Sequence, residues 1–386
     1  MASVEASLDG HFAPDARHFE SLTRSVADSA ERYLRGLYQS SRANMERMAD
    51  VVEGSHYQRV HHMLSESSWD REGVRRQLVV DANGHFGRGG TALVIDESGF
   101  AKKGTHSAGV ARQWNGRMGK TDNCQVGVFA AITRRQVAAL VDAELYLPKA
   151  WTSDPKRCEA AGIPESAREF RTKGGIAFDM ALRARRSGLL FDWVTFDAGY
   201  GHLPWLLQAL EDEGERFFAE LHSDQAIYLT DPQPAKGRAP TRLASELTPV
   251  TVAAWATAQA PTAWRRRKLR DGEKGEVERA FEDAKSACGM AHCQVRGWEA
   301  WHHHMTLVMI VLMFRVKQRI EGLDTHRLLS RQDIVEILKH KLPSKTHTDE
   351  ELVMTIANRH HRRLQAAKSA YGKQGKMPPA SFGKPI

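Results

Sequence analysis

Two short apolar runs constrain the fold of this chain most. They are TALVIDESG at positions 91–99 and FDWVTFDAGYG at positions 191–201. Short apolar runs of this kind, next to turn-forming residues, are typical of buried central strands, so both segments are expected to be strands. Asp96 and Asp197 end the two predicted strands. If these strands pair, both carboxylates come to the same edge of one sheet.

The neighbouring segments predict the rest of that sheet. CQVGVFAAI at 124–132 and QVAALVDAELYLP at 136–148 have strand character, so residues 91–147 are expected to form a three-stranded meander. Helical spacing follows at 167–187, before the second aspartate-bearing strand, and again after that strand up to Leu210. This order predicts an α/β fold in which helices flank a mixed sheet.

The pattern divides the chain into five parts. Apolar residues at three- and four-residue spacing predict an all-helical N-terminal domain, and the long apolar stretch after Trp298 predicts a central core helix. The predicted parts are the N-terminal helical domain, with DNA binding as a candidate role (1–85), the first part of the α/β core (86–230), an insertion or linker (231–275), C-terminal helices that complete the core (276–365) and a disordered tail (366–386).

Composition favours a cytoplasmic protein with a polyanionic partner. Lysine and arginine outnumber aspartate and glutamate by 55 to 47, which gives a net charge of +8. A basic surface that is merely solvated is the alternative. The four cysteines are too sparse for a disulfide framework. The N-terminus lacks the layout of a signal peptide, and the longest apolar run, at 305–314, is too short to span a bilayer.

Carboxylates gathered at a sheet edge suit phosphodiester chemistry. Two divalent ions about 3.5–4 Å apart can stabilise the attacking and leaving oxygens when oxygen ligands meet at one point. Glu278 is the best candidate for a third acid, because it opens a predicted helix whose Phe281 and Ala284 face inward and whose Lys285 follows on the same side. The simpler alternative is that the aspartates are turn or cap residues and the glutamate is solvated.

Three segments together resemble the DDE transposases of bacterial insertion sequences. They are TALVIDESGFAKKG, FDWVTFDAGYG and VERAFEDAKSACGMAHCQVRGWEAWHHHMTLVM. In that family the catalytic Glu is followed seven positions later by a Lys, and Glu278 with Lys285 reproduces this spacing, whereas Glu276 and Glu282 do not. With YQRVHHMLSESSWD, which looks like the segment before the first catalytic strand, the resemblance covers roughly residues 20–325.

The resemblance implies a ribonuclease-H-like fold and a set of site residues. Asp96, Asp197 and Glu278 would be the catalytic residues and would bind two Mg²⁺ ions, for which Mn²⁺ can substitute. The implied activity is cutting double-stranded DNA at the terminal inverted repeats of an element and joining the 3′-hydroxyl ends to target DNA. A homodimer in the complex that joins two ends is expected, as is a location in the bacterial cytosol at the nucleoid.

Two departures from the family pattern leave alternatives open. The family carries a Tyr and an Arg seven and four positions before the Glu, where this chain has Asp271 and Lys274. The family's largely β-stranded insertion is also shortened, since WRRRKLRDGEKG runs almost directly into VERAFEDAK. A catalytically inactive DNA-binding protein derived from a transposase, and a nuclease of the same fold that does not join strands, are therefore the alternatives.

Basic residues near these motifs are candidates for DNA contacts. Lys285 would hold a phosphate beside the acids, and WRRRKLR at 264–270 combines basic side chains with a stacking tryptophan. The candidates are Lys285, Lys274, Arg265, Arg266, Arg267, Lys102, Lys103 and Arg112. A zinc site at Cys288, His292 and Cys293 is disfavoured by the spacing, so the histidines at 302–304 are expected to line the start of the core helix.

Overall fold

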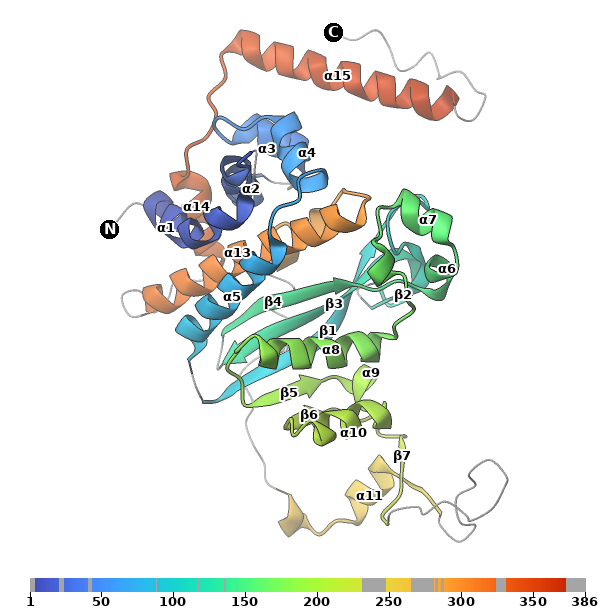
Figure 1. Cartoon of the computed structure of the whole chain (residues 1–386). Coiled ribbons are helices and arrows are strands. Elements are labelled where there is room, and N and C mark those ends of the chain that lie inside the picture. Colours follow the sequence, from blue (N-terminus) through green and yellow to red (C-terminus); the bar gives the residue numbers. More distant parts are fainter. Residues whose placement is uncertain are drawn as a thin grey trace.

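The computed structural model in Figure 1 shows a mixed sheet, helices that cover it and an all-helical N-terminal region. The structure describes residues 4–20, 24–40, 44–87, 89–116, 118–134, 137–230, 248–264, 281, 284–285, 288–323 and 331–372. Within this part of the chain, no helix combines the length and the apolar character that crossing a membrane requires.

The central sheet is six-stranded. β1, β3 and β4 form an antiparallel meander, and β5 and β6 extend the sheet on the other side of β1, parallel to it. β2 pairs with the first part of β3. The strands are β1 Thr91–Ala101, β2 Ala111–Asn115, β3 Lys120–Arg134, β4 Val137–Leu145, β5 Trp193–Phe196 and β6 Phe217–Ala219. The order β4-β3-β1-β5-β6 confirms the expected ribonuclease-H-like fold.

Two details of the sheet correct the sequence-based prediction. Asp96 lies in the middle of β1 and not at its end, because β3 pairs with β1 along the whole of Thr91–Ala101. β5 pairs only with residues 92–95 of β1, so Asp96 still stands where the parallel pairing stops. The sequence does not predict β2, since its short segment ARQWN is mostly polar and its side chains are partly exposed.

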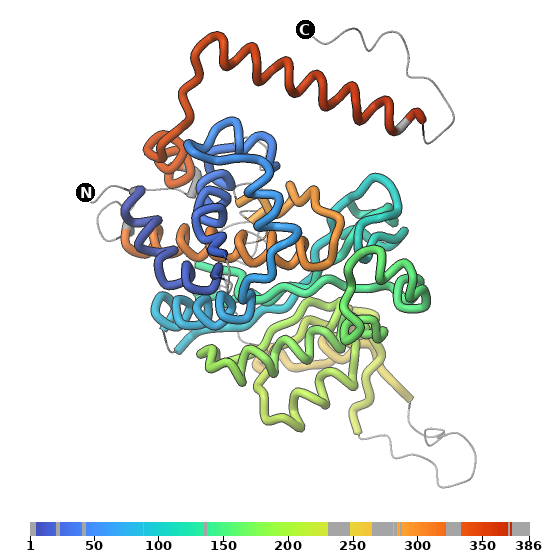
Figure 2. Tube along the Cα trace, turned by 45° about the horizontal axis from the view of Figure 1, so that its top comes forward, coloured from blue at the N-terminus to red at the C-terminus, as the bar shows by residue number. Residues whose placement is uncertain are grey.

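Helices α8 and α13 pack on different parts of the sheet. α8, Lys173–Arg186, lies against β1 and β3, whereas α13, Trp298–Leu323, runs along β4 together with α5 (Figures 1 and 2). Every residue at 305–314 of α13 is buried, so this helix is covered on all sides. The predicted central core helix is therefore confirmed.

The N-terminal helices share one hydrophobic core with the sheet domain, because they pack around α13. His303 of α13 stacks on Trp69 with ring centroids 4.2 Å apart, and His304 Nδ1 lies 2.7 Å from the hydroxyl of Tyr33. His303 and His304 thus serve packing between helices, whereas Nε2 of His302 accepts from the backbone N–H of Leu145 on β4 at 3.5 Å. These N-terminal helices are α1 Val4–Ala16, α2 Ala27–Gln39, α3 Met45–Val51, α4 Tyr57–Ser65 and α5 Arg71–Phe86.

Shorter elements connect the parts of the core. α6 and α7 follow β4, α9 and α10 follow β5, and a small antiparallel pair, β7 with β8, precedes α11. Part of the predicted insertion at 231–275 therefore carries secondary structure, and the rest of it lies outside the described residues. The bounds are α6 Lys149–Thr152, α7 Pro155–Ala160, α9 Ala198–Gly201, α10 Pro204–Asp212, β7 Ala226–Ile227, β8 Val250–Thr251 and α11 Val252–Ala258.

The C-terminal region corrects two further expectations. α14, Arg331–Lys341, packs on α13 and α2, but α15, Asp349–Gly372, stands apart from the sheet domain and does not complete its core (Figure 1). The predicted disordered tail begins at 366, yet residues 366–372 continue α15 as helix, which its Leu, Gln, Ala and Lys residues favour. Residues 373–386 lie outside the described chain.

Candidate active site

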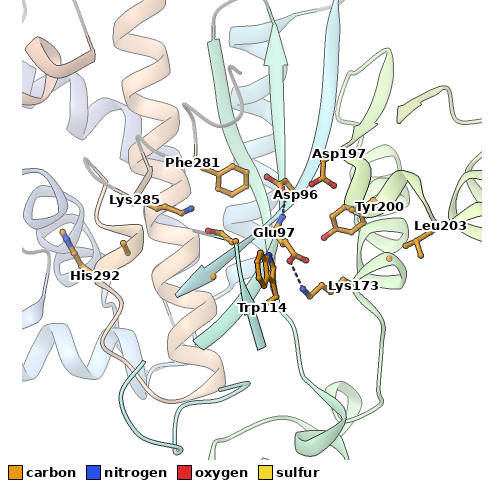
Figure 3. Close-up of a pocket in the computed structure, with 16 residues that line it drawn as sticks. Asp96, Glu97, Trp114, Lys173, Asp197, Tyr200, Leu203, Phe281, Lys285 and His292 are labelled. Carbon is orange, nitrogen blue, oxygen red and sulfur yellow. Dashed lines mark hydrogen bonds and ion pairs between the residues drawn. The ribbon is translucent and has the colours of Figure 1, made fainter. Parts of the chain in front are cut away.

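The register of the parallel strands places the two aspartates side by side. Ile95 of β1 is paired with Phe196 of β5. Asp96 is the next residue of β1, and Asp197 directly follows the last residue of β5. Neighbouring strands lie about 4.8 Å apart, so Asp96 and Asp197 meet where the pairing ends. Figure 3 shows both carboxylates at the same place beside the sheet. The predicted meeting of these two acids is what the structure shows.

Asp96 points to the side of the sheet on which α13 packs. Its antiparallel partner on β3 is Phe129, and paired residues project from the same face. Phe129 contacts Trp301 of α13 and Phe281, with ring centroids 6.1 Å and 5.6 Å away. The segment around Phe281 is therefore held against the sheet beside Asp96.

A cavity of about 850 Å³ surrounds the two aspartates. It is lined by residues of β1, the end of β2, the start of α8, the turn after β5, the helical residues 281 and 285, and residues 291–292. The charged or hydroxyl-bearing residues among them include Asp96, Glu97, Lys173, Asp197, Tyr200 and Lys285. Most of these are labelled in Figure 3. The site is thus a wide cavity in which carboxylates and lysines lie among apolar side chains.

The environment of Asp96 disfavours a negative charge. Burial raises the pKa of Asp96 to about 7, and the nearby charges of Asp197 and Glu97 act in the same direction. The backbone N–H of Glu97, which donates to Oδ1 of Asp96 at 2.6 Å, and the charge of Lys285 partly oppose this rise in pKa. A cation placed between such a carboxylate and its acidic neighbour would strongly stabilise the charged form of the carboxylate.

The cavity residues that were not among the sequence candidates include Glu97, Lys173 and Tyr200. Lys173 donates from Nζ to Oε1 of Glu97 at 2.7 Å, and its Nζ lies 5.5 Å from the centroid of the Tyr146 ring. Burial, together with the carboxylates of the cavity, raises the pKa of Tyr200 well above its ordinary value, so this hydroxyl stays protonated. The sequence signal for Glu97 and Tyr200 is their position one and three residues after the aspartates, whereas Lys173 is distant in sequence.

The third acid and several basic candidates lie outside the described residues. These are Glu278, Lys274, Arg265, Arg266 and Arg267. Phe281 and Lys285, three and seven positions after Glu278, are described and both line the cavity. Among the described residues, no group of three or more His, Cys, Asp and Glu side chains is arranged to hold a metal ion. Of the three predicted acids, the described residues include Asp96 and Asp197, which lie side by side.

The remaining candidates for DNA contacts are placed differently. Lys285 lines the cavity beside the acids. Lys102 donates from Nζ to the carbonyl of Cys293 at 2.5 Å, so this lysine supports the chain near residue 293. Lys103 and Arg112 are exposed to solvent. Cys288 and Cys293 are both buried, and Nη1 of Arg315 lies 3.5 Å from Sγ of Cys288.

Comparisons with known proteins agree with this geometry. A family model described as DDE superfamily endonuclease matches residues 17–276, which is well over half of the chain and includes both aspartates. This match ends before Glu278, so it says nothing about the third acid.

A curated relative also matches. It is a "Probable transposase for insertion sequence element IS701" from Microchaete diplosiphon, 31% identical over 196 residues, which span 49% of this chain and 44% of the relative. The alignment thus covers less than half of that protein. Among solved structures, a piggyBac transposase synaptic complex with hairpin DNA aligns over 88% of this chain and 77% of that one, with 11% identity and a TM-score of 0.38. A likeness this distant adds nothing to the fold seen directly.

Proposed function

Because this chain belongs to the DDE superfamily endonuclease family, we propose that it is a DNA transposase. It cuts DNA at the ends of an insertion element and joins the 3′-hydroxyl ends to target DNA. The observation that carries the proposal is the adjacency of Asp96 and Asp197, which the strand register brings together in one polar cavity. The relative named as a probable transposase supports the same activity.

The donor set of the cavity fits Mg²⁺. Carboxylate oxygens are the ligands that this ion prefers, and Asp96 with Asp197 supply them from two adjacent strands. We propose that these two residues and Glu278 hold two Mg²⁺ ions, or Mn²⁺ in their place. When bound, such ions stabilise charge on the attacking and leaving oxygens of a phosphodiester. The raised pKa of Asp96 supports this assignment, because a cation would offset both the burial of the carboxylate and the repulsion from Asp197.

Other side chains of the cavity would bind and shield the DNA strand. Lys285 and Lys173 place positive charge at the cavity, next to acids that would repel a phosphate. Phe281 and Phe129 form an apolar wall beside Asp96, which limits access of bulk water from that side. Tyr200, held protonated, adds no further negative charge to the floor of the cavity.

Partners and location follow from the proposed activity. The substrates would be double-stranded DNA with the terminal inverted repeats of the element and a target DNA, and the site of action would be the nucleoid in the bacterial cytosol. Joining two ends requires that two copies act together, so a homodimer is part of the proposal.

The proposal is tested with labelled DNA that carries the ends of the element, in Mg²⁺ or Mn²⁺. The parent protein should give cleaved and joined products, and Asp96→Asn, Asp197→Asn and Glu278→Ala should each abolish them. Glu213→Gln removes an exposed acid that caps α10 away from the cavity and should leave the products unchanged. Equal activity of the parent and the three variants would refute the assignment of these acids.

Two alternatives are separated by the same experiment. An inactive DNA-binding protein, which the acid at 271 and the shortened insertion favour, would bind the labelled ends but give no metal-dependent products. A nuclease of the same fold would cleave the ends without joining them to target DNA. Joined products exclude both.

A further inference from the structure

Helix α15 lies at the periphery of the described part of the chain. Figures 1 and 2 show it on the outside of the N-terminal helices, where the segment after α14 leads to it. An isolated helix of this kind is only marginally stable in water, since most helices depend on packing of an apolar face. α15 also exposes a run of apolar side chains, with Leu352 45%, Val353 57% and Met354 65% exposed. Because successive residues of a helix point about 100° apart, these three side chains face different directions and do not by themselves form one surface.

One side of α15 is already occupied by the body of the protein. Arg359 forms an ion pair with Asp50 at 2.7 Å, and Arg362 forms one with Glu46 at 3.1 Å. The guanidinium of Arg362 also lies 5.6 Å from the centroid of the Tyr57 ring. These contacts orient the helix, because they fix which side faces α3 and α4.

The opposite side of α15 follows from helix geometry. With about 100° of rotation per residue, the positions farthest from the side of Arg359 and Arg362 form a stripe along the helix. We name this stripe the outer face of α15; its members are Glu350, Val353, Ala357, Leu364 and Lys368, and Tyr371 of the last turn lies in line with Val353. Glu350 and Lys368 are exposed, and the apolar members lie between them.

The outer face is complementary to itself in the antiparallel direction. Glu350 and Lys368 lie at equal distances in sequence on either side of Arg359, and Val353 and Leu364 lie at nearly equal distances from it. Two copies of α15 can be placed antiparallel about a twofold axis that passes at the level of Arg359. Each Glu350 then faces a Lys368 of the other copy, and each Val353 faces a Leu364. Ala357 then lies near the axis, where a small side chain allows close approach of two helices.

We infer that the outer face of α15 binds α15 of a second copy of this chain, in an antiparallel pair related by a twofold axis. A twofold interface must be self-complementary, and this face carries that pattern. DNA is a poorer fit, because the face holds one acid and one lysine and not a row of basic side chains. The pairing leaves the bodies of the two protomers on opposite sides, since the body occupies the other side of each helix.

The test measures the mass of the full chain in solution against its concentration, without DNA, by analytical ultracentrifugation. The parent should dimerise as concentration rises. Glu350→Lys or Lys368→Glu should each raise the dissociation constant on the order of tenfold, because each turns two attractive pairs into two repulsive ones. The double variant with both changes should restore the parent value.

Val353→Asp provides a second test, since it places a charge in the apolar centre of the proposed pair. It should abolish the dimer. Because Val353 is 57% exposed in the single chain, the melting temperature and circular dichroism of the monomer should not change. Asp197→Asn, which removes a proposed catalytic acid far from α15, should dimerise like the parent. The dimerisation test is therefore independent of the proposed activity.

Three results would overturn the inference. The first is a parent that stays monomeric at every concentration. The second is a dimer whose dissociation constant neither Glu350→Lys nor Val353→Asp changes. The third is a pattern in DNA binding. Lys368→Glu would weaken DNA binding, Glu350→Lys would strengthen it, and the double variant would show no link between DNA binding and dimerisation. This pattern would assign the outer face to DNA.

Discussion

At the scale of single residues, Asp15 of α1 stands out because it is fully buried and neither of its carboxylate oxygens has a partner among the described residues. Burial raises the pKa of Asp15 to about 8, and the charge of Asp81 acts in the same direction. The folded protein therefore retains this proton over a range in which the unfolded chain, with a pKa near 3.9, has lost it. Stability is lost as pH rises from about 4 to about 8.

Replacement of Asp15 by Asn should remove this penalty. We expect Asp15→Asn to stabilise the protein little near pH 5 and by on the order of 2–4 kcal/mol more near pH 8.5. Urea unfolding of both proteins at the two pH values measures the difference. An exposed control, Asp28→Asn, should not show the same dependence, because that carboxylate is 62% exposed. Equal effects of Asp15→Asn at both pH values would contradict the burial argument.

Lys173 is the residue of the cavity whose role is most open to test. Its Nζ is held by Glu97 and by the ring of Tyr146, so it is already oriented when a phosphate arrives. If the proposed function holds, Lys173→Ala should weaken binding of the element ends about tenfold and reduce the slope of log K against log salt by about one. Lys156→Ala, an exposed lysine of α7 that does not line the cavity, is the control. An unchanged salt slope would remove Lys173 from the DNA interface.

The sequence could indicate some of these residues and not others, for a physical reason. Asp96 and Asp197 each follow an apolar run, and that local pattern is enough to predict that they meet when the strands pair. The pair of Lys173 with Glu97 joins residues far apart in the chain, and nothing in the local sequence of either one records the other. Glu278 remains a prediction, since it lies outside the described residues.

At the scale of elements, strands and helices were predictable where burial dictates the pattern. β3 and α13 are apolar along their buried lengths, and both were expected at their observed positions. β2 and the helical end of α15 were missed because exposed elements leave no apolar pattern in the sequence. The extension of β1 past Asp96 was missed because pairing with β3, and not the local sequence, sustains it.

The turn after β5 depends on one glycine. A Cβ at Gly201 would lie 2.0 Å from the carbonyl oxygen of Glu220, so α9 could not sit this close to the end of β6. Gly201→Ala should destabilise the protein by about 2–4 kcal/mol, because backbone must move beside Asp197. The control is Gly84→Ala in α5, where no atom lies within 4 Å of the new Cβ. That change should stabilise the protein by up to about 1 kcal/mol through helix propensity. Chemical unfolding of both variants measures the change in the free energy of unfolding. If the two variants changed it in the same direction, the close-contact argument would be contradicted.

At the scale of the whole molecule, the N-terminal helices and the sheet domain form one structural unit, although the sequence suggested a separate N-terminal domain. The reason is α13, which is apolar on every side and therefore needs cover from both groups of elements. His303 against Trp69 and His304 against Tyr33 are contacts of this shared core. α15, by contrast, is tied to the rest by ion pairs near its middle.

Two truncations should therefore behave in opposite ways. Removal of residues 1–86 uncovers the apolar side of α13 that α2 and α5 bury, so the remaining chain should lose cooperative unfolding and aggregate. Removal of residues 346–386 takes away α15, which contributes little to the shared core, so the melting temperature should fall by no more than about 3 °C. Calorimetry of both truncated chains measures this contrast. A cooperative transition in the chain that lacks residues 1–86 would show that the N-terminal helices are an independent domain, as the sequence alone suggested.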